Sequence, residues 1–143
     1  MSSDVKINRI NINSIKKKLI PFFKSQVDVR LAFLFGSVAE KRTHSQSDID
    51  IAVYYVGKAT LNRHVRLIND VGYLLETDNI DVVNMNTAST FILHDILSFG
   101  NLLICKDDDL YKGLRLKTLR DFDDLTHIIK IQSQYIFKGA TNG

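Results

Sequence analysis

The sequence is poor in the residues that build disulfide scaffolds and in the segments that cross membranes. It holds one cysteine, Cys105, among 143 residues, which excludes an internal disulfide framework and a cysteine-based zinc cluster and fits a reducing cytoplasm. No apolar run reaches the roughly 20 residues that a membrane helix needs, and the polar start MSSDVKINRI lacks the core of a signal peptide. We therefore expect a cytoplasmic protein without a membrane segment.

The chain also lacks repeats, low-complexity tracts and Gly/Ser linkers. Its composition, 45% hydrophobic and 24% charged, is that of an ordinary globular protein. A single domain over residues 1–143 is expected. Such a domain buries roughly two-thirds of its unfolded surface. That length excludes an enzyme with separate catalytic and substrate-binding domains of ordinary size.

Charge is unevenly spread, although the net charge is only +3. Residues 1–42 hold nine basic and three acidic side chains. Residues 43–109 reverse this balance, with four basic and ten acidic side chains, and residues 110–143 hold six basic and three acidic ones. A basic flank can attract a polyanion, and an acidic centre can attract a cation. The central segment is therefore where a cation site is to be sought.

Apolar periodicity predicts eight elements of secondary structure. In chain order, they are a helix through residues 15–23 capped by Asn13 or Ser14, strands over 29–35 and 48–55, a helix over 61–75, a strand over 80–84, a helix over 89–99 closed by Gly100, a strand over 102–105 and a helix from Asp108 onward. This order predicts an α/β fold in which a mixed β-sheet is flanked by helices.

Three helices carry more specific expectations. Pro21 should kink the first helix or start a second piece of it, because proline lacks an N–H and crowds the preceding turn. The last helix keeps apolar spacing over nearly thirty residues, which indicates a break or a face offered to a partner. The helix over 61–75 should turn one apolar set toward the core. That set is Leu61, Val65, Ile68, Val71 and Leu75.

The segment that carries chemistry is FGSVAEKRTHSQSDIDIAV, at residues 35–53. Gly36 and Ser37 end one predicted strand, and Asp48 and Asp50 lie on one face of the next. Two converging carboxylates suit Mg²⁺, which is completed by water and phosphate oxygens. A glycine that allows close backbone approach, followed by a serine hydroxyl and free N–H groups, suits a phosphate. The segment therefore predicts a nucleoside triphosphate site.

Asp81 on the following strand is a third candidate carboxylate. If its strand pairs beside residues 48–55, Asp81 can share a second metal or accept the proton of an attacking hydroxyl. Arg42 and Ser47 lie in the loop between the first two strands and are candidate phosphate contacts. The four histidines show no ligand spacing and are interpreted as structural or solvated. They are His44, His64, His94 and His127.

These residues resemble the nucleotidyltransferase superfamily related to DNA polymerase beta, whose members carry Gly-Ser, a spacer, Asp-x-Asp and a later Asp. The chain length and the tail LRLKTLRDFDDLTHIIKIQ are similar to the minimal nucleotidyltransferase antitoxins, which are encoded beside HEPN-domain ribonuclease toxins. The resemblance implies a mixed sheet flanked by helices. It also implies ATP- and Mg²⁺-dependent transfer of AMP to a tyrosine of the partner toxin. The two proteins would form a type VII toxin–antitoxin pair and a hetero-oligomer.

The residue-level matches to this superfamily are five. They are Gly36, Ser37, Asp48, Asp50 and Asp81. The chain departs from many relatives in having Glu40 and Lys41 where they have Arg and Gly, and Arg42 is the adjacent residue that could substitute.

Two alternatives stay open at this point. The chain could be an antitoxin that acts by binding alone, or a nucleotidyltransferase that acts on an RNA end or a small-molecule hydroxyl.

Overall fold

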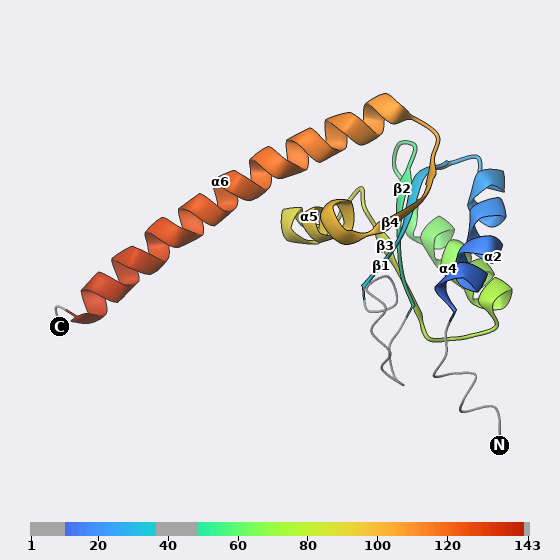
Figure 1. Cartoon of the computed structure of the whole chain (residues 1–143), viewed down its shortest axis with the longest axis horizontal. Helices are drawn as coiled ribbons and strands as arrows, with labels where there is room; N and C mark the ends of the chain where they lie inside the picture. Colours follow the sequence, from blue (N-terminus) through green and yellow to red (C-terminus); the bar gives the residue numbers. More distant parts are fainter. Residues whose placement is uncertain (1–10, 37–48, 142–143) are drawn as a thin grey trace, which may run out of the picture.

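The computed structural model describes residues 11–36 and 49–141, and the elements within them follow the expected order (Figure 1). They are α2 (Ile12–Ser25), β1 (Val29–Phe35), β2 (Ile49–Tyr55), α4 (Leu61–Leu75), β3 (Ile80–Asn84), α5 (Thr90–Phe99), β4 (Asn101–Cys105) and α6 (Asp108–Thr141). The predicted α/β fold class is confirmed.

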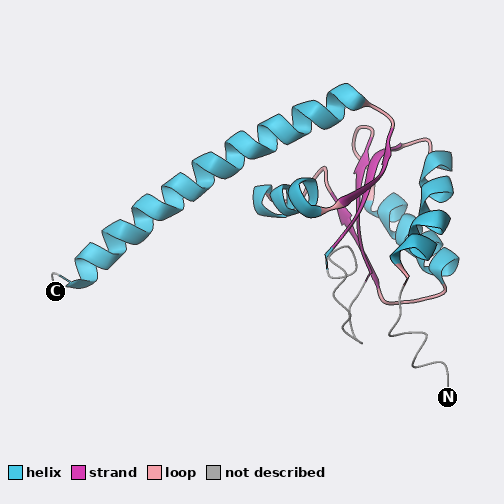
Figure 2. Ribbon diagram, in the orientation of Figure 1, coloured by secondary structure: helices cyan, strands magenta, loops and turns pink. Residues whose placement is uncertain are grey.

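The four described strands form one mixed sheet in the order β3-β2-β1-β4 (Figure 2). β1 pairs antiparallel with both β2 and β4, whereas β2 and β3 run parallel. β1 lies inside the sheet and is covered on both faces, which explains its continuous apolar run VRLAFLF.

Helices cover both faces of this sheet. α2 and α4 pack on one face, and α5 with the start of α6 packs on the other (Figure 1). Alternate residues of β1 divide between the two layers, with Ala32 and Leu34 facing α2 and α4, and Leu31 and Phe33 facing α5 and α6. The side of the sheet on which a residue lies therefore follows from its parity along the strand.

α2 differs from the expectation at its start and at Pro21. Its N-cap is Asn11, whose side chain accepts a hydrogen bond from the Asn13 N–H at 3.0 Å, so the caps expected at Asn13 or Ser14 were wrong. The helix runs as one element through Pro21 and is not split there. The proline ring is exposed, and the fully buried Leu19 and Phe23 hold the helix to the sheet on either side of it.

α4 has the expected bounds but turns a different face to the core. Leu61 and Val65 are 78% and 45% exposed, so two of the five expected core residues were wrong. The expected Val71 is fully buried, and Ile68 and Leu75 pack partly buried against the core, while Leu67, outside the expected set, is fully buried as well. The reason is tertiary, because polar side chains on the first turns of α4 bond to the sheet and set the rotation of the helix, as described below.

α5 begins at the N-cap Ser89, whose hydroxyl accepts from the Ile92 N–H, and it ends at Gly100 as expected. α6 is one unbroken helix of 34 residues, so the expected alternative of a break was wrong. Its start is capped by Asp107, whose carboxylate accepts from the Leu110 N–H at 3.0 Å. None of the described helices is long and apolar enough to cross a bilayer.

Candidate active site

An acidic pair lies at the end of the sheet where β1 ends and β2 and β3 begin. Asp50 on β2 and Asp81 on β3 are register partners in the parallel ladder, so both project from the same face. Their neighbours Ile49, Ile51 and Val82 are buried in the opposite layer, under α2 and α4. Asp50 is half-buried and Asp81 is exposed. The strand pairing on which the expected role of Asp81 depended is present, and it places Asp50 and Asp81 on one face.

Gly36 brings the end of β1 against Asp50. Phe35 is the register partner of Asp50, and Gly36 follows it with a φ of +78°, which L side chains rarely adopt. A Cβ on Gly36 would lie 2.9 Å from the Asp50 Cγ and would overlap a carboxylate oxygen. The absence of a side chain at Gly36 therefore makes the space that the Asp50 carboxylate occupies.

The other candidate site residues lie outside the described part of the chain. These are Ser37, Arg42, Ser47 and Asp48. Within residues 11–36 and 49–141, no three His, Cys, Asp or Glu side chains gather closely enough to hold a metal ion. The donor set still suits Mg²⁺, because Asp50 and Asp81 offer carboxylate oxygens from one face and Mg²⁺ takes one or two carboxylates together with substrate phosphates.

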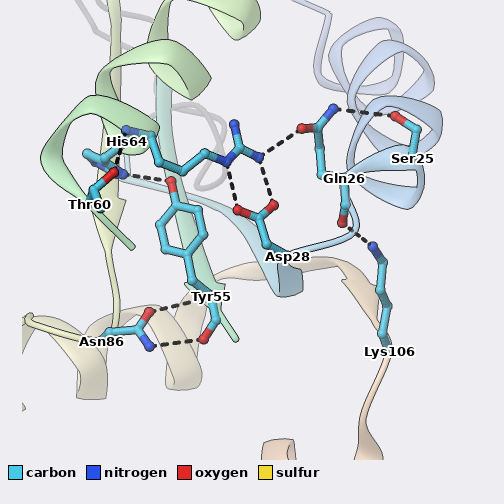
Figure 3. A network of polar contacts seen from close by, with 9 residues as sticks. Ser25, Gln26, Asp28, Tyr55, Thr60, His64, Asn86 and Lys106 are labelled. Carbon is cyan, nitrogen blue, oxygen red and sulfur yellow. Dashed lines mark hydrogen bonds and ion pairs between the residues drawn. The ribbon is translucent and has the colours of Figure 1, made fainter. Parts of the chain in front are cut away.

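The far end of the sheet carries a polar network that is structural (Figure 3). Arg63 on α4 donates two hydrogen bonds to the Asp28 carboxylate, at 2.7 and 2.8 Å, and one to the Gln26 side chain at 2.9 Å. The Arg63 guanidinium lowers the pKa of Asp28, first by hydrogen bonding and then by its charge. This pair ties α4 to the turn between α2 and β1, and so helps to set the rotation of α4.

His64 completes the attachment of α4 to the sheet. Its Nε2 lies 2.8 Å from the Val82 carbonyl oxygen, which can only accept, so Nε2 carries the proton. Nδ1 then accepts from the Tyr55 hydroxyl at 2.8 Å (Figure 3). Burial raises the pKa of Tyr55 to about 12. The interpretation of His64 as structural is thus supported by both of its ring nitrogens.

Sequence reasoning missed the contacts that attach α4. Asp28 and Arg63 are separated by 35 positions, and neither belongs to a local motif that would mark it as paired. His94 stacks on Phe122 at 3.6 Å, which joins α5 to α6 and supports its structural interpretation. His44 lies outside the described residues, and His127 is exposed.

Residues 17–109, a span that includes Gly36 and all three candidate aspartates, match the family model described as polymerase beta, nucleotidyltransferase. The chain belongs to the polymerase beta nucleotidyltransferase family. The acidic pair and the glycine beside it are therefore parts of a nucleotidyltransferase fold.

Two curated relatives are similar to this chain over much of their length. Protein adenylyltransferase MntA of Shewanella oneidensis is 31% identical over 101 residues, which cover 67% of this chain and 70% of that protein. A putative protein adenylyltransferase of Methanocaldococcus jannaschii is 34% identical over 89 residues, which cover 62% of this chain and 94% of that protein. Both names describe transfer of an adenylyl group to protein.

Solved structures show the same nucleotidyltransferase fold. A toxin–antitoxin structure with AMP-PNP matches with a TM-score of 0.72 at 23% identity, over 85% of this chain and 98% of the matched chain. The MntA–HepT toxin–antitoxin structure matches with a TM-score of 0.68 at 21% identity, over 87% of this chain and 98% of that chain. At these identities the likeness confirms the fold.

Proposed function

We propose that this nucleotidyltransferase is an antitoxin that moves AMP from ATP to a tyrosine hydroxyl of a partner HEPN-domain ribonuclease toxin and thereby neutralises it. Family membership and the names of the two relatives support adenylyl transfer to protein. One matched structure is described as a tri-AMPylated HEPN toxin of Shewanella oneidensis in complex with an MNT antitoxin, which supports the choice of acceptor. ATP as the donor favours a cytoplasmic site of action.

The observation that carries this proposal is the in-register acidic pair beside Gly36. Asp50 and Asp81 lie on one face at the strand ends, and Gly36 leaves room for the Asp50 carboxylate. We assign Asp50, together with Asp48, to holding Mg²⁺ on the triphosphate, with Asp81 as a further ligand. When bound, Mg²⁺ neutralises charge on the phosphates and helps to orient them.

The phosphate contacts are assigned to the segment that follows β1. Gly36 permits close approach of the backbone, and the Ser37 hydroxyl and neighbouring N–H groups donate to phosphate oxygens. Arg42 and Ser47, in the same segment, are assigned to the outer phosphates. These assignments rest on the motif and on the position of Gly36 beside Asp50.

The proposed reaction is an in-line displacement at the α-phosphorus. The acceptor tyrosine oxygen forms a bond to phosphorus, the bond from phosphorus to the bridging oxygen of the β-phosphate breaks, and pyrophosphate leaves. Asp81 accepts the hydroxyl proton, a role that suits an exposed carboxylate which, in the part of the chain that the structure describes, forms no salt bridge. Catalysis then comes mainly from positioning and from charge neutralisation.

Neutralisation by binding alone is the second candidate function. It is favoured by the second half of α6, where every residue from His127 to Ile136 is exposed although several are large and apolar. A catalytic and a binding role are compatible, so the test must separate transfer of AMP from neutralisation of the toxin.

The decisive variant for the enzyme is Asp48→Asn with Asp50→Asn. We expect it to fold, to bind a cognate HEPN-domain toxin, and to transfer no label from α-³²P-ATP to that protein. Asp78→Asn, which removes an exposed carboxylate outside the pair, is the control and should transfer label as the wild type does. Retained transfer by the double variant would remove the assignment of the acidic site, and full neutralisation without transfer would favour binding alone.

A further inference from the structure

The second half of α6 extends away from the rest of the described fold. α6 has 34 residues, which at 1.5 Å per residue is a rod of about 50 Å. Its first half packs on the body through Tyr111 against Phe33 and through Phe122 against Phe91 and His94. Beyond that contact the helix runs past α5 (Figure 1).

One face of this extended half is apolar and free of charge. Its members recur at spacings of three and four along the helix, so they form a continuous strip that we call the distal stripe. The distal stripe consists of Leu125, Ile128, Ile129, Gln132, Tyr135 and Ile136. Tyr135 and Ile136 are 81% and 71% exposed, and Ile128 and Ile129 are about half exposed. A large apolar patch of this kind marks an interaction site.

The distal stripe continues a row that is already used for packing inside the fold. Thr118, Phe122 and Leu125 follow one another at spacings of four and three, and the same row continues to Ile129 and Ile136. Thr118 is buried and Phe122 stacks on His94 of α5, whereas the row is uncovered from Ile129 onward. Ile128 and Tyr135 make this apolar face wider than the seam of a coiled coil, which is formed by two positions of each heptad. A face of this width suits a groove between two helices.

α6 leaves the body on the same face of the sheet that bears the acidic pair. Asp50 alternates with Ala52 on β2, and Ala52 belongs to the layer formed with α5 and the start of α6. A protein that covers the distal stripe therefore lies on the side of the sheet toward which Asp50 and Asp81 project. Docking there places the acceptor on the catalytic face.

The charge that borders the distal stripe is basic. Residues 125–141 contain Lys130 and Lys138 and no acidic residue. Lys138 follows Tyr135 by three positions and so borders the stripe, whereas Lys130 has no stripe member three or four positions away and lies on the opposite side of α6. A partner with an apolar groove and an acidic rim would be complementary.

We propose that the distal stripe is the docking surface for the protein that accepts AMP, through an apolar groove between two helices of that partner with an acidic rim. The inference rests on the proposed function, because it assigns the stripe to the acceptor of the same reaction. It adds the surface that holds the acceptor while its hydroxyl reaches Asp50 and Asp81.

The test compares two variants of the same helix in the full chain. Ile129→Asp with Ile136→Asp places charge in the distal stripe, whereas Gln134→Asp places it on the opposite side of α6 at a residue that is also exposed. All three positions are exposed, so folding is preserved, and circular dichroism checks it. Binding to a cognate HEPN-domain toxin is measured by calorimetry without ATP, and AMP transfer is measured in parallel.

We expect the stripe variant to bind at least ten-fold more weakly and to show a raised KM for the acceptor with an unchanged KM for ATP, while Gln134→Asp stays within two-fold of the wild type. Equal binding by both variants would overturn the docking surface even if AMP transfer is intact. A wild-type dimer that the stripe variant dissociates, with acceptor binding unchanged, would assign the stripe to a second copy. Absence of AMP transfer by the wild type, with binding that still depends on the stripe, would refute the proposed function and leave the docking surface standing.

Discussion

Replacing Gly36 by alanine tests how closely the backbone approaches Asp50. Two effects add at this position. A side chain at a φ of +78° is strained, and a left-handed backbone costs an L residue roughly 1–2 kcal/mol. The new Cβ would also lie 2.9 Å from the Asp50 Cγ, 0.5 Å short of the 3.4 Å at which ordinary contact begins. The carboxylate therefore has to move.

Gly57 provides the matched control for this variant. Its φ is +65°, and a Cβ there would meet nothing within 4 Å, so Gly57→Ala carries the backbone strain without the overlap. For a domain of this size, strain of 1–2 kcal/mol lowers Tm by roughly 3–8 °C in either variant. A misplacement near 1 Å at a catalytic group costs about 100-fold in rate, which we expect for Gly36→Ala alone.

The assay pairs thermal unfolding with kcat/KM for AMP transfer to the HEPN-domain partner. Gly36→Ala should lose about 100-fold in kcat/KM, by the misplacement argument, while Gly57→Ala stays within about two-fold of the wild type. Wild-type activity in Gly36→Ala, or an equal loss in both variants, would refute the argument that Gly36 makes room for the Asp50 carboxylate.

Two further predictions concern stability. Asp28→Asn should lower the free energy of unfolding by about 1–2 kcal/mol at neutral pH, because the bidentate hydrogen bond to Arg63 is lost. The pKa of Asp28 is lowered from its ordinary 3.8 in the folded state, so this loss should persist above pH 4 and shrink as the pH falls below that value. Urea unfolding at pH 7, 5 and 3 measures it, and a cost that does not vary with pH would count against the pair. Pro21→Ala should raise the free energy of unfolding by about 1–3 kcal/mol, because α2 continues through an exposed proline and alanine restores the backbone N–H that proline lacks. An unchanged midpoint of urea unfolding would show that position 21 does not behave as a helix interior.

The order of elements was predictable because each carries its own period. β1 reads as a continuous apolar run because helices cover both of its faces, and β2 alternates strictly enough to place Asp50 opposite the isoleucines that flank it. The same parity placed Asp81 on the face of Asp50 once the two strands were taken as neighbours, and the parallel ladder confirms this.

Features set by distant contacts could not be read in the same way. The rotation of α4 leaves Leu61 exposed because Arg63 and His64 bond to Asp28, Tyr55 and Val82, and these partners have no local signature. The cap of α2 moved to Asn11 although Asn13 and Ser14 are equally good capping residues, because Ile12 also packs against the core as the first helical residue. Competing local signals of equal strength are resolved by packing.

The most direct test of the central claim is the intact mass of the HEPN-domain partner after incubation with this chain, ATP and Mg²⁺. The account predicts a mass increase of one or more AMP units with the wild type, none with Asp50→Asn, and a wild-type increase with the control Asp78→Asn. An unmodified partner that is nevertheless neutralised by the wild type, or equal modification by Asp50→Asn, would contradict it.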